Sequence, residues 1–206
     1  MDGVMGHAGM AAAAVRYLRS ADRAPDPVEA LPRPELRCVR EDERPPVPQD
    51  EFRRVLGCFA TGVTVVTADD EGTPVGFACQ SFTSLSLEPP LVAFMVGRTS
   101  TTWPRIARAG AFCVNVLAAH QGPLCRAFAV SGADKFAGVA HDPSPVSGSP
   151  RLAETLAWID CTVHAVHTGG DHLVVVGRVD ALGAPGADRP PLLFHRGRFG
   201  RMSDGG

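Results

Sequence analysis

The pattern of hydrophobic and polar positions changes near residue 49. Proline and charged residues crowd positions 21–48, where no apolar periodicity is present. Such a segment cannot bury enough apolar surface to offset the entropy lost on ordering. We therefore expect residues 1–48 to be a disordered extension, residues 49–200 to form one folded domain, and residues 201–206 to be a tail.

Within the domain, short apolar segments with two different periods alternate with turn signals. Phe52, Val55, Leu56 and Phe59 recur at helical spacing, and Asp50 is placed to cap that helix. Proline near the start predicts a helix over 102–109 that Thr101 or Thr102 can cap. A third helix is predicted over 122–130, and a loop rich in glycine and proline over 140–150. β-branched runs and turn residues predict strands at 63–67, 73–79, 81–87, 91–96, 112–117, 157–166, 172–182 and 191–196. Many short strands with a few small helices indicate a mainly β fold of the barrel type.

Composition narrows the classes of partner and location. Of the 206 residues, 45% are hydrophobic and 20% charged, and the net charge of -2 gives no reason to expect nucleic acid or an anionic membrane as partner. No apolar window approaches the ~18 residues of a membrane span. Six widely and irregularly spaced cysteines favour reduced, buried thiols over a disulfide framework. We expect a cytoplasmic protein.

The usual nucleotide and hydrolase motifs are absent from the sequence. There is no GxGxxG after a strand, no GxxxxGK[ST], no GxSxG and no HExxH. His164 and His167 are three apart in a predicted strand, so they should face opposite sides and not share a metal. We expect no metal site.

A continuous series of motifs resembles the flavin reductase-like family with an FMN-binding split barrel, the reductases of two-component flavin monooxygenases. The central segment reads GFACQSFTSLSLEPPLV over 76–92, and the other blocks follow in the family's order: FRRVLG (52–57), ATGVTVVT (60–67), FCVNVL (112–117), DKFAG (134–138), IDC (159–161), GDH (170–172) and PLLFHRG (191–197). The resemblance covers roughly residues 50–200 and is strongest to actinobacterial reductases that serve aromatic-ring and steroid hydroxylases. It implies an FMN-binding split β-barrel with a few short peripheral helices.

The resemblance also implies where a flavin is bound. Small residues at Gly76, Ala78 and Ser81 permit a flat ring to approach a strand edge. Backbone groups there can pair with the polar pyrimidine edge of the ring. The residues that border the flavin in this interpretation are Pro74, Val75, Gly76, Phe77, Ala78, Gln80, Ser81, Met95, Val96 and Gly97.

Two further segments complete the expected site. Ser100, Thr101 and Thr102 offer hydroxyl donors for the phosphate, with Arg98 a candidate for added charge. In relatives the Gly170–Asp171–His172 turn lies beside the flavin, and its histidine contacts the nicotinamide. His172 is therefore expected to orient the nicotinamide, and no residue is needed as acid or base because hydride passes between the two cofactors.

Two departures from the family pattern are present. Phe199 stands where relatives often have tyrosine, so any role for a phenol is in doubt. Ala78 stands where many have threonine, with the loss of one hydroxyl contact.

The function implied is an NAD(P)H-dependent flavin reductase that uses NADH or NADPH to reduce FMN or FAD and supplies a partner monooxygenase, as a homodimer. The alternative is a module on the same barrel that stores or senses flavin without rapid nicotinamide turnover. A barrel like pyridoxamine-phosphate oxidase is disfavoured because that family's basic phosphate-binding residues are not recognisable.

Overall fold

A computed structural model describes residues 46–132 and 134–202 of the chain. Almost all of the expected N-terminal extension and most of the expected tail lie outside these residues. The described elements are α2 (Gln49–Leu56), β1 (Thr61–Gly62), β2 (Thr64–Asp70), β3 (Thr73–Cys79), β4 (Thr83–Ser86), β5 (Leu91–Gly97), α3 (Trp103–Ala109), β6 (Ala111–Val116), η1 (Ala119–Gln121), α4 (Gly122–Ala129), β7 (His141–Pro143), β8 (Pro150–Leu152), β9 (Ala157–Gly169), β10 (His172–Gly183), β11 (Leu192–His195) and β12 (Arg198–Arg201). None of the described helices is long and apolar enough to cross a membrane.

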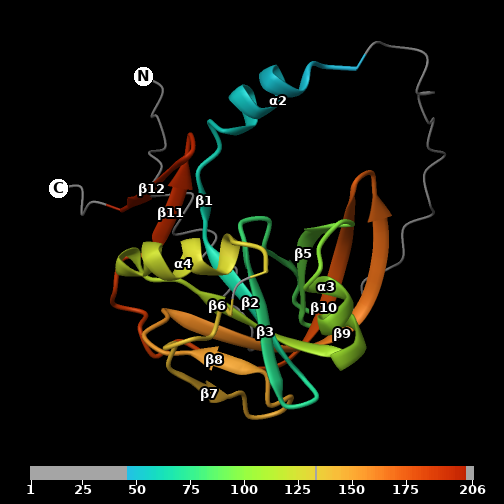
Figure 1. The fold of residues 1–206 in the computed structure, drawn as a ribbon, viewed down its shortest axis with the longest axis vertical. Coiled ribbons are helices and arrows are strands. Elements are labelled where there is room, and N and C mark those ends of the chain that lie inside the picture. The colour runs from blue at the N-terminus through green and yellow to red at the C-terminus, as the bar shows by residue number, and fades with distance from the viewer. Residues whose placement is uncertain (1–45, 133, 203–206) are drawn as a thin grey trace, which may run out of the picture. The chain divides into compact units, whose positions relative to one another are not determined.

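Seven strands form one antiparallel sheet in the order β3-β2-β6-β9-β10-β5-β4 (Figure 1). The sheet curls so that its two ends approach each other after β3. There the Ser81 hydroxyl accepts a hydrogen bond from the Met95 N–H (2.9 Å) and donates one to the Met95 carbonyl oxygen (3.0 Å). The barrel is thus joined at this point through side chains rather than by a ladder of backbone bonds, and the fold is the expected mainly β split barrel.

The core consists of two clusters of buried side chains. The larger fills the barrel around Phe94 and Phe112, whose ring centroids are 5.2 Å apart at nearly right angles. The smaller lies under α4 around Phe128 and Leu117. The larger cluster consists mainly of the inward-facing alternate residues of the strands, as the period of two requires, whereas the smaller combines residues of α4 and of connecting segments with a few strand residues.

A buried polar cluster fixes the small β7–β8 hairpin to the sheet. Asn115 of β6 is fully buried; its amide group donates to the Val65 carbonyl oxygen (3.2 Å) and the Thr67 hydroxyl (3.1 Å), and its oxygen accepts from the Leu152 N–H (2.8 Å). Nearby, buried Asp160 accepts the N–H groups of Val146 and Ser147. Each of these buried polar groups is paired within the protein, as stability demands.

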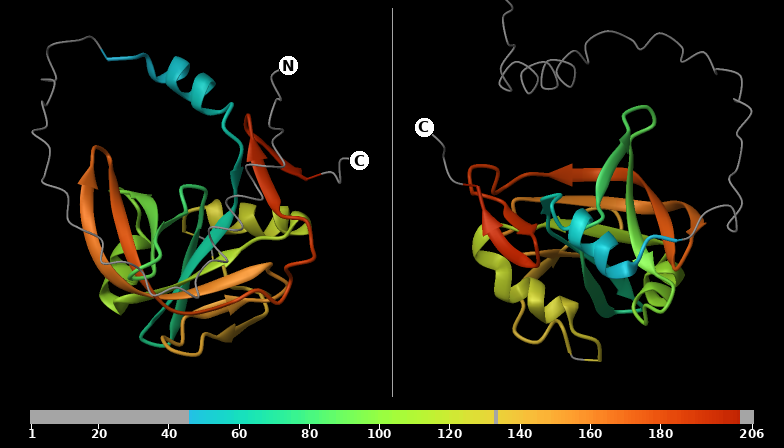
Figure 2. Two further views of the ribbon diagram at one scale, coloured as in Figure 1. Left: turned by 180° about the vertical axis from the view of Figure 1, so that it is seen from behind. Right: turned by 90° about the horizontal axis from the view of Figure 1, so that it is seen from above.

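The first helix departs from the sequence prediction. Asp50 lies inside α2, which begins after Pro48 and has no side-chain cap. No residue of α2 is buried: on the apolar face predicted from the helical spacing, Phe52, Val55 and Leu56 are about half exposed. Figures 1 and 2 show α2 standing clear of the barrel strands.

Four other expectations need correction. The stretch 140–150, expected as a loop, contains β7 and the start of β8, which pair with each other. The strand β12 was not predicted, and it pairs with β11. A register shift in the β9–β10 ladder leaves His164 without a paired residue, so simple alternation does not hold between His164 and His167. Cys58 is exposed, while the other four described cysteines are buried.

Candidate functional site

Three adjoining hollows form a groove along β3, which we call the β3 groove. The first hollow, of about 360 Å³, contains His172 and is lined by Phe77, Ala78, Cys79, Gln80, Ser81, Met95, Val96, Gly97 and Ser100 besides. The second, of about 330 Å³, shares Phe77, Ala78, Gly97 and Ser100 with the first and adds Thr99, Thr101, Thr102, Phe128, Ala129, Ser131 and Lys135. The third, of about 390 Å³, shares Thr101, Thr102 and Lys135 with the second and adds Thr73, Pro74, Val75, Gly76, Arg105, Gly132, Asp134 and Phe136.

The wall of the groove is an edge strand. Within the described residues β3 pairs only with β2, so half of its backbone N–H and C=O groups face away from the sheet. The Gly76 carbonyl oxygen is one of these, because it accepts a hydrogen bond from the Lys135 ammonium (3.1 Å). Residues two apart face the same way, so the N–H and C=O of Ala78 also face outward. Ala78 lines both the first and the second hollow.

Gly76 has a packing role besides the one expected. A Cβ atom at this position would lie 2.9 Å from both the Phe128 ring and the Val66 carbonyl oxygen. The absent side chain therefore makes room for packing of α4 on β3.

The loop between β5 and α3 forms the opposite wall. Ser100, rather than Thr101 or Thr102, caps α3: its hydroxyl accepts the Trp103 N–H (3.2 Å), and Thr102 makes no capping bond through its side chain. The two threonine hydroxyls are thereby left beside the second and third hollows. Cys79 lines the first hollow, where burial raises the pKa of its thiol, so the thiol is a neutral part of the wall.

His172 lies next to Gly97 on the adjacent strand. These two residues are directly paired between β10 and β5, and a Cβ atom at Gly97 would lie 3.9 Å from the His172 Nε2 atom. The ring's Nδ1 atom lies 2.8 Å from an Asp171 carboxylate oxygen, and this hydrogen bond lowers the pKa of that carboxyl. Asp171 also accepts the Arg98 N–H through its backbone (2.9 Å), which ties the turn to the groove loop. Gly170 supplies the positive φ of 65° that this turn requires.

The predicted flavin, phosphate and nicotinamide segments are thus brought together. Every predicted site residue lines one of the three hollows except Gly170 and Asp171. These two form the turn before His172, and the Asp171 carboxylate bonds its ring. Arg98 takes part through its backbone, and its side chain lines none of the three.

Sequence reasoning missed the cations of the groove. Lys135 and Arg105 were given no role, although Lys135 is the only lysine in the sequence and lies in the DKFAG block. Its isolation among arginines was the available signal. Arg105 carried no such signal, because its place depends on how α3 packs beside β2.

The Phe199 departure lies away from the groove. The Phe199 ring packs against Phe194 (centroids 5.6 Å apart) and under the Arg126 guanidinium. It lines none of the three hollows.

Comparison with known proteins gives a consistent picture. Residues 56–203 match the family described as flavin reductase like domain. The chain is 55% identical over 148 residues to the reductase subunit HsaB of a flavin-dependent monooxygenase from Rhodococcus jostii, covering 72% of this chain and 75% of that one. Among solved structures it resembles nitrilotriacetate monooxygenase component B from Mycobacterium thermoresistibile, with a TM-score of 0.73, 51% identity and coverage of 75% and 87% of the two chains. It also resembles the Streptomyces globisporus NADH:FAD oxidoreductase SgcE6 in complex with NAD and FAD fragments, with a TM-score of 0.72, 38% identity and coverage of 76% and 93%.

Proposed function

The chain belongs to the flavin reductase like family and is a nicotinamide-dependent flavin oxidoreductase, and we propose that the β3 groove is where this reaction takes place. Reduced flavin made here supplies a monooxygenase carried on another chain, a proposal supported by the name of the relative HsaB as the reductase subunit of a flavin-dependent monooxygenase. The observation that carries the proposal is the convergence of the β3 edge, the 100–102 hydroxyls and His172 on one groove.

The groove fits a flavin by its exposed backbone. The pyrimidine side of a flavin ring presents alternating hydrogen-bond donors and acceptors, which are costly to bury unpaired. The outward N–H and C=O of Ala78 offer one donor and one acceptor on a flat edge. This recognition needs no side chain, so alanine in place of the common threonine leaves it intact.

A phosphate fits the second hollow. The hydroxyls of Thr101 and Thr102 line it, and the Lys135 ammonium supplies a positive charge. Charge-assisted hydrogen bonds of this kind are stronger than neutral ones. We assign phosphate binding to these side chains, because α3 is only seven residues long and Ser100 already satisfies its first N–H.

The protein's part in the reaction is to hold two rings in contact. When both are bound, the nicotinamide supplies a hydride from its C4 atom and the flavin ring accepts it at N5. His172 at the rim of the first hollow orients the nicotinamide, and its Nδ1–Asp171 hydrogen bond fixes the imidazole plane. Such positioning replaces the need for an acid or base.

A direct assay tests the proposal. Purified protein is mixed with FMN or FAD, and the oxidation of NADH and NADPH is followed by absorbance. We expect flavin-dependent oxidation with at least one donor. Flavin binding without any such oxidation would instead support the storage or sensor module.

We further propose that the chain is a homodimer in which α2 contributes to the interface. Its apolar face is exposed, with Phe52, Val55 and Leu56 about half accessible, and Phe59 beyond the helix end is 75% accessible. An uncovered apolar surface of this kind marks an interaction site. Light scattering after size exclusion should give twice the chain mass, and Phe52→Ser with Leu56→Ser should give the single mass.

We also propose a cytoplasmic location. The five described cysteines are free thiols, four of them buried, and NADH and NADPH are intracellular hydride donors. Fractionation of cells that produce the protein, with detection by antibody, tests this.

A further inference from the structure

The third hollow is not needed by a flavin mononucleotide, and we propose that it seats the adenylate half of FAD. This inference rests on the proposed function, because it assumes that the isoalloxazine ring lies in the first hollow. It names the dinucleotide as the flavin for which the β3 groove is built.

The three hollows succeed one another along β3 from its C-terminal end to its N-terminal end. The first lies at the Cys79 end, the second beside Phe77 and Ala78, and the third at the 73–76 end. The seven residues of β3 extend for roughly 20 Å at about 3.3 Å per residue. A ring in the first hollow and a phosphate in the second therefore leave the rest of the groove to what lies beyond that phosphate.

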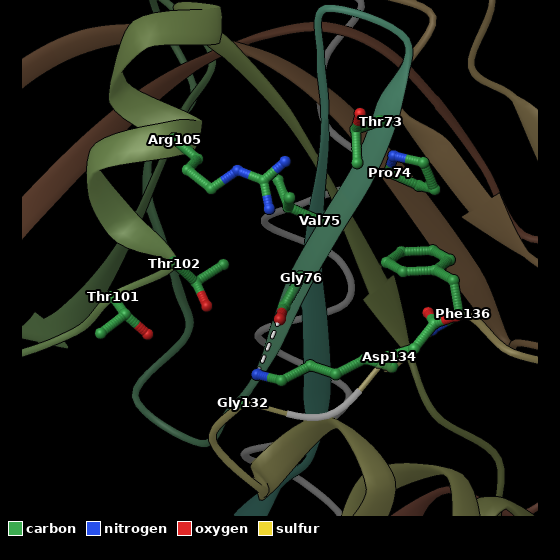
Figure 3. Close-up of a pocket in the computed structure, with 11 residues that line it drawn as sticks. Thr73, Pro74, Val75, Gly76, Thr101, Thr102, Arg105, Gly132, Asp134 and Phe136 are labelled. Atoms are coloured by element: carbon green, nitrogen blue, oxygen red, sulfur yellow. Dashed lines mark hydrogen bonds between the residues drawn. The ribbon is translucent and has the colours of Figure 1, made fainter.

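The charge of the third hollow suits a second phosphate. Arg105 bonds Asp70 only through its Nε atom (2.6 Å), which leaves both Nη groups free of hydrogen bonds to the described residues. Figure 3 shows this guanidinium directed across the hollow toward Val75 and Gly76. The Lys135 ammonium, hydrogen-bonded to the neutral Gly76 carbonyl, lines both the second and the third hollow, where a pyrophosphate would pass.

The remaining charges leave an excess of positive charge. Asp70 is shared between Arg105 and Arg108, whose Nη2 atom lies 2.7 Å from both carboxylate oxygens. Asp134 also lines the third hollow, and one of its oxygens accepts the Phe136 N–H (3.1 Å) within its own turn. Of the charged residues that line the third hollow, two are cations, Arg105 and Lys135, and one is a carboxylate, Asp134. Burial lowers the pKa of Lys135, and a nearby phosphate would raise that pKa again.

The wall of the third hollow suits a flat base. Pro74 and Phe136 line it, and Figure 3 shows both side chains at the hollow. Aromatic and apolar side chains stack on nucleobases at a useful gain in affinity. Because His172 lies at the other end of β3, this wall is remote from the expected nicotinamide position.

Binding of oxidised flavins without nicotinamide tests the inference separately from catalysis. Quenching of flavin fluorescence on titration with the full-length protein gives the dissociation constants of FMN and FAD. We expect FAD to bind at least ~10-fold more tightly, a difference of about 1.4 kcal/mol. Equal binding, or tighter binding of FMN, together with normal turnover would overturn this inference and leave the proposed function standing. Absence of binding by either flavin would overturn both.

A matched pair of variants locates the effect. Arg105→Gln and Arg108→Gln each remove one partner of Asp70, but only Arg105 lines the third hollow. We expect Arg105→Gln to reduce the FAD-to-FMN affinity ratio ~5-fold or more, by loss of a phosphate contact, while Arg108→Gln leaves the ratio as in the parent. Equal losses in both variants, or a change confined to the KM of NADH or NADPH, would contradict the assignment.

Chemical modification of the parent protein tests the same assignment if a variant does not fold. Because Lys135 is the only lysine, acetylation at this residue can be followed by mass spectrometry in the parent protein. AMP alone, without flavin, should slow acetylation of Lys135 and should compete with FAD more strongly than with FMN. Failure of AMP to do either would show that the third hollow does not take an adenylate.

Discussion

Two polar regions of this barrel differ in whether the protein satisfies them. In the cluster around Asn115, amide, hydroxyl and backbone groups are buried and bonded to one another. In the β3 groove, the hydroxyls of Thr101 and Thr102 and the outward backbone of Ala78 face open hollows. Polar residues of similar chemistry hold the fold in one place and are available to a ligand in the other.

The difference separates stability from binding. A buried group that loses its partner costs the desolvation free energy of the orphaned atom. A polar group of the groove has no protein partner, so a substitution there costs little stability. The same substitution removes a contact with the ligand and so lowers binding affinity. Substitutions in the two regions should therefore affect different measurements.

The largest effect should come from Asn115→Ala. This change leaves the buried Leu152 N–H without its partner and removes the amide bond to the Thr67 hydroxyl, and we expect the free energy of unfolding to fall by about 3 kcal/mol. Urea denaturation followed by circular dichroism measures this. Flavin affinity of the folded fraction should be unchanged, and a large loss of affinity at full stability would break the separation of the two regions.

Gly97→Val should act in the opposite way. A Cβ atom at this position meets nothing closer than 3.9 Å, so the strand tolerates it, but the branched side chain enters the first hollow beside His172. We expect flavin affinity to fall ~100-fold with unfolding free energy changed by less than about 1 kcal/mol.

Gly62→Val is the matched control for that change. Gly62 also lies in a strand, and no atom lies within 4 Å of an added Cβ. Unaltered flavin binding is expected here. If both valine variants lose affinity alike, the effect belongs to the strands and not to the groove.

His172→Ala should distinguish the nicotinamide end of the groove from the rest of it. Loss of the imidazole removes the group expected to orient the nicotinamide, so the KM for NADH should rise ~10-fold while that for flavin changes little. His167→Ala, an exposed histidine of the same hairpin that lines none of the three hollows, is the control. Equal increases in the two KM values would argue against the assignment of His172.

The smallest effect concerns Asp70, the carboxylate to which Arg105 of the third hollow is bonded. Hydrogen bonds from Arg108 and Arg105 lower the pKa of this carboxyl below its ordinary 3.8. A lowered folded-state pKa contributes stability above the unfolded value, and that contribution is lost as the pH falls through the folded value. Acid denaturation of Asp70→Asn should therefore show a weaker pH dependence below about pH 4 than the parent. An identical dependence would show that the ion cluster is screened by solvent.

The sequence was most informative where periodicity and turn chemistry agree. The predicted bounds of β3 match the observed strand, and those of β10 and α4 end within a residue. The family motifs named the groove residues correctly as neighbours, since most of them share a hollow. The assignment of each to flavin, phosphate or nicotinamide remains a prediction.

What could not be predicted depended on tertiary partners. The spacing of Phe52 and Val55 indicates a helix with an apolar face. It does not tell whether another element covers that face, and in the described residues none does. The β7–β8 hairpin is held by Asn115 and Thr67, which are distant in sequence. Its own proline-rich sequence therefore resembles that of a loop. Gly76 illustrates the same limit: its small size is required by Phe128, a residue of another element.

The uncovered margin of β3 has a consequence for handling the protein. A strand whose hydrogen-bonding groups are unused can template addition of a strand from another molecule, which is a route to precipitation. A nucleotide lying along that margin, as proposed, would cap it. Preparations stripped of flavin should then lose material on storage faster than preparations kept with it, and the shelf life of the protein would depend on its substrate.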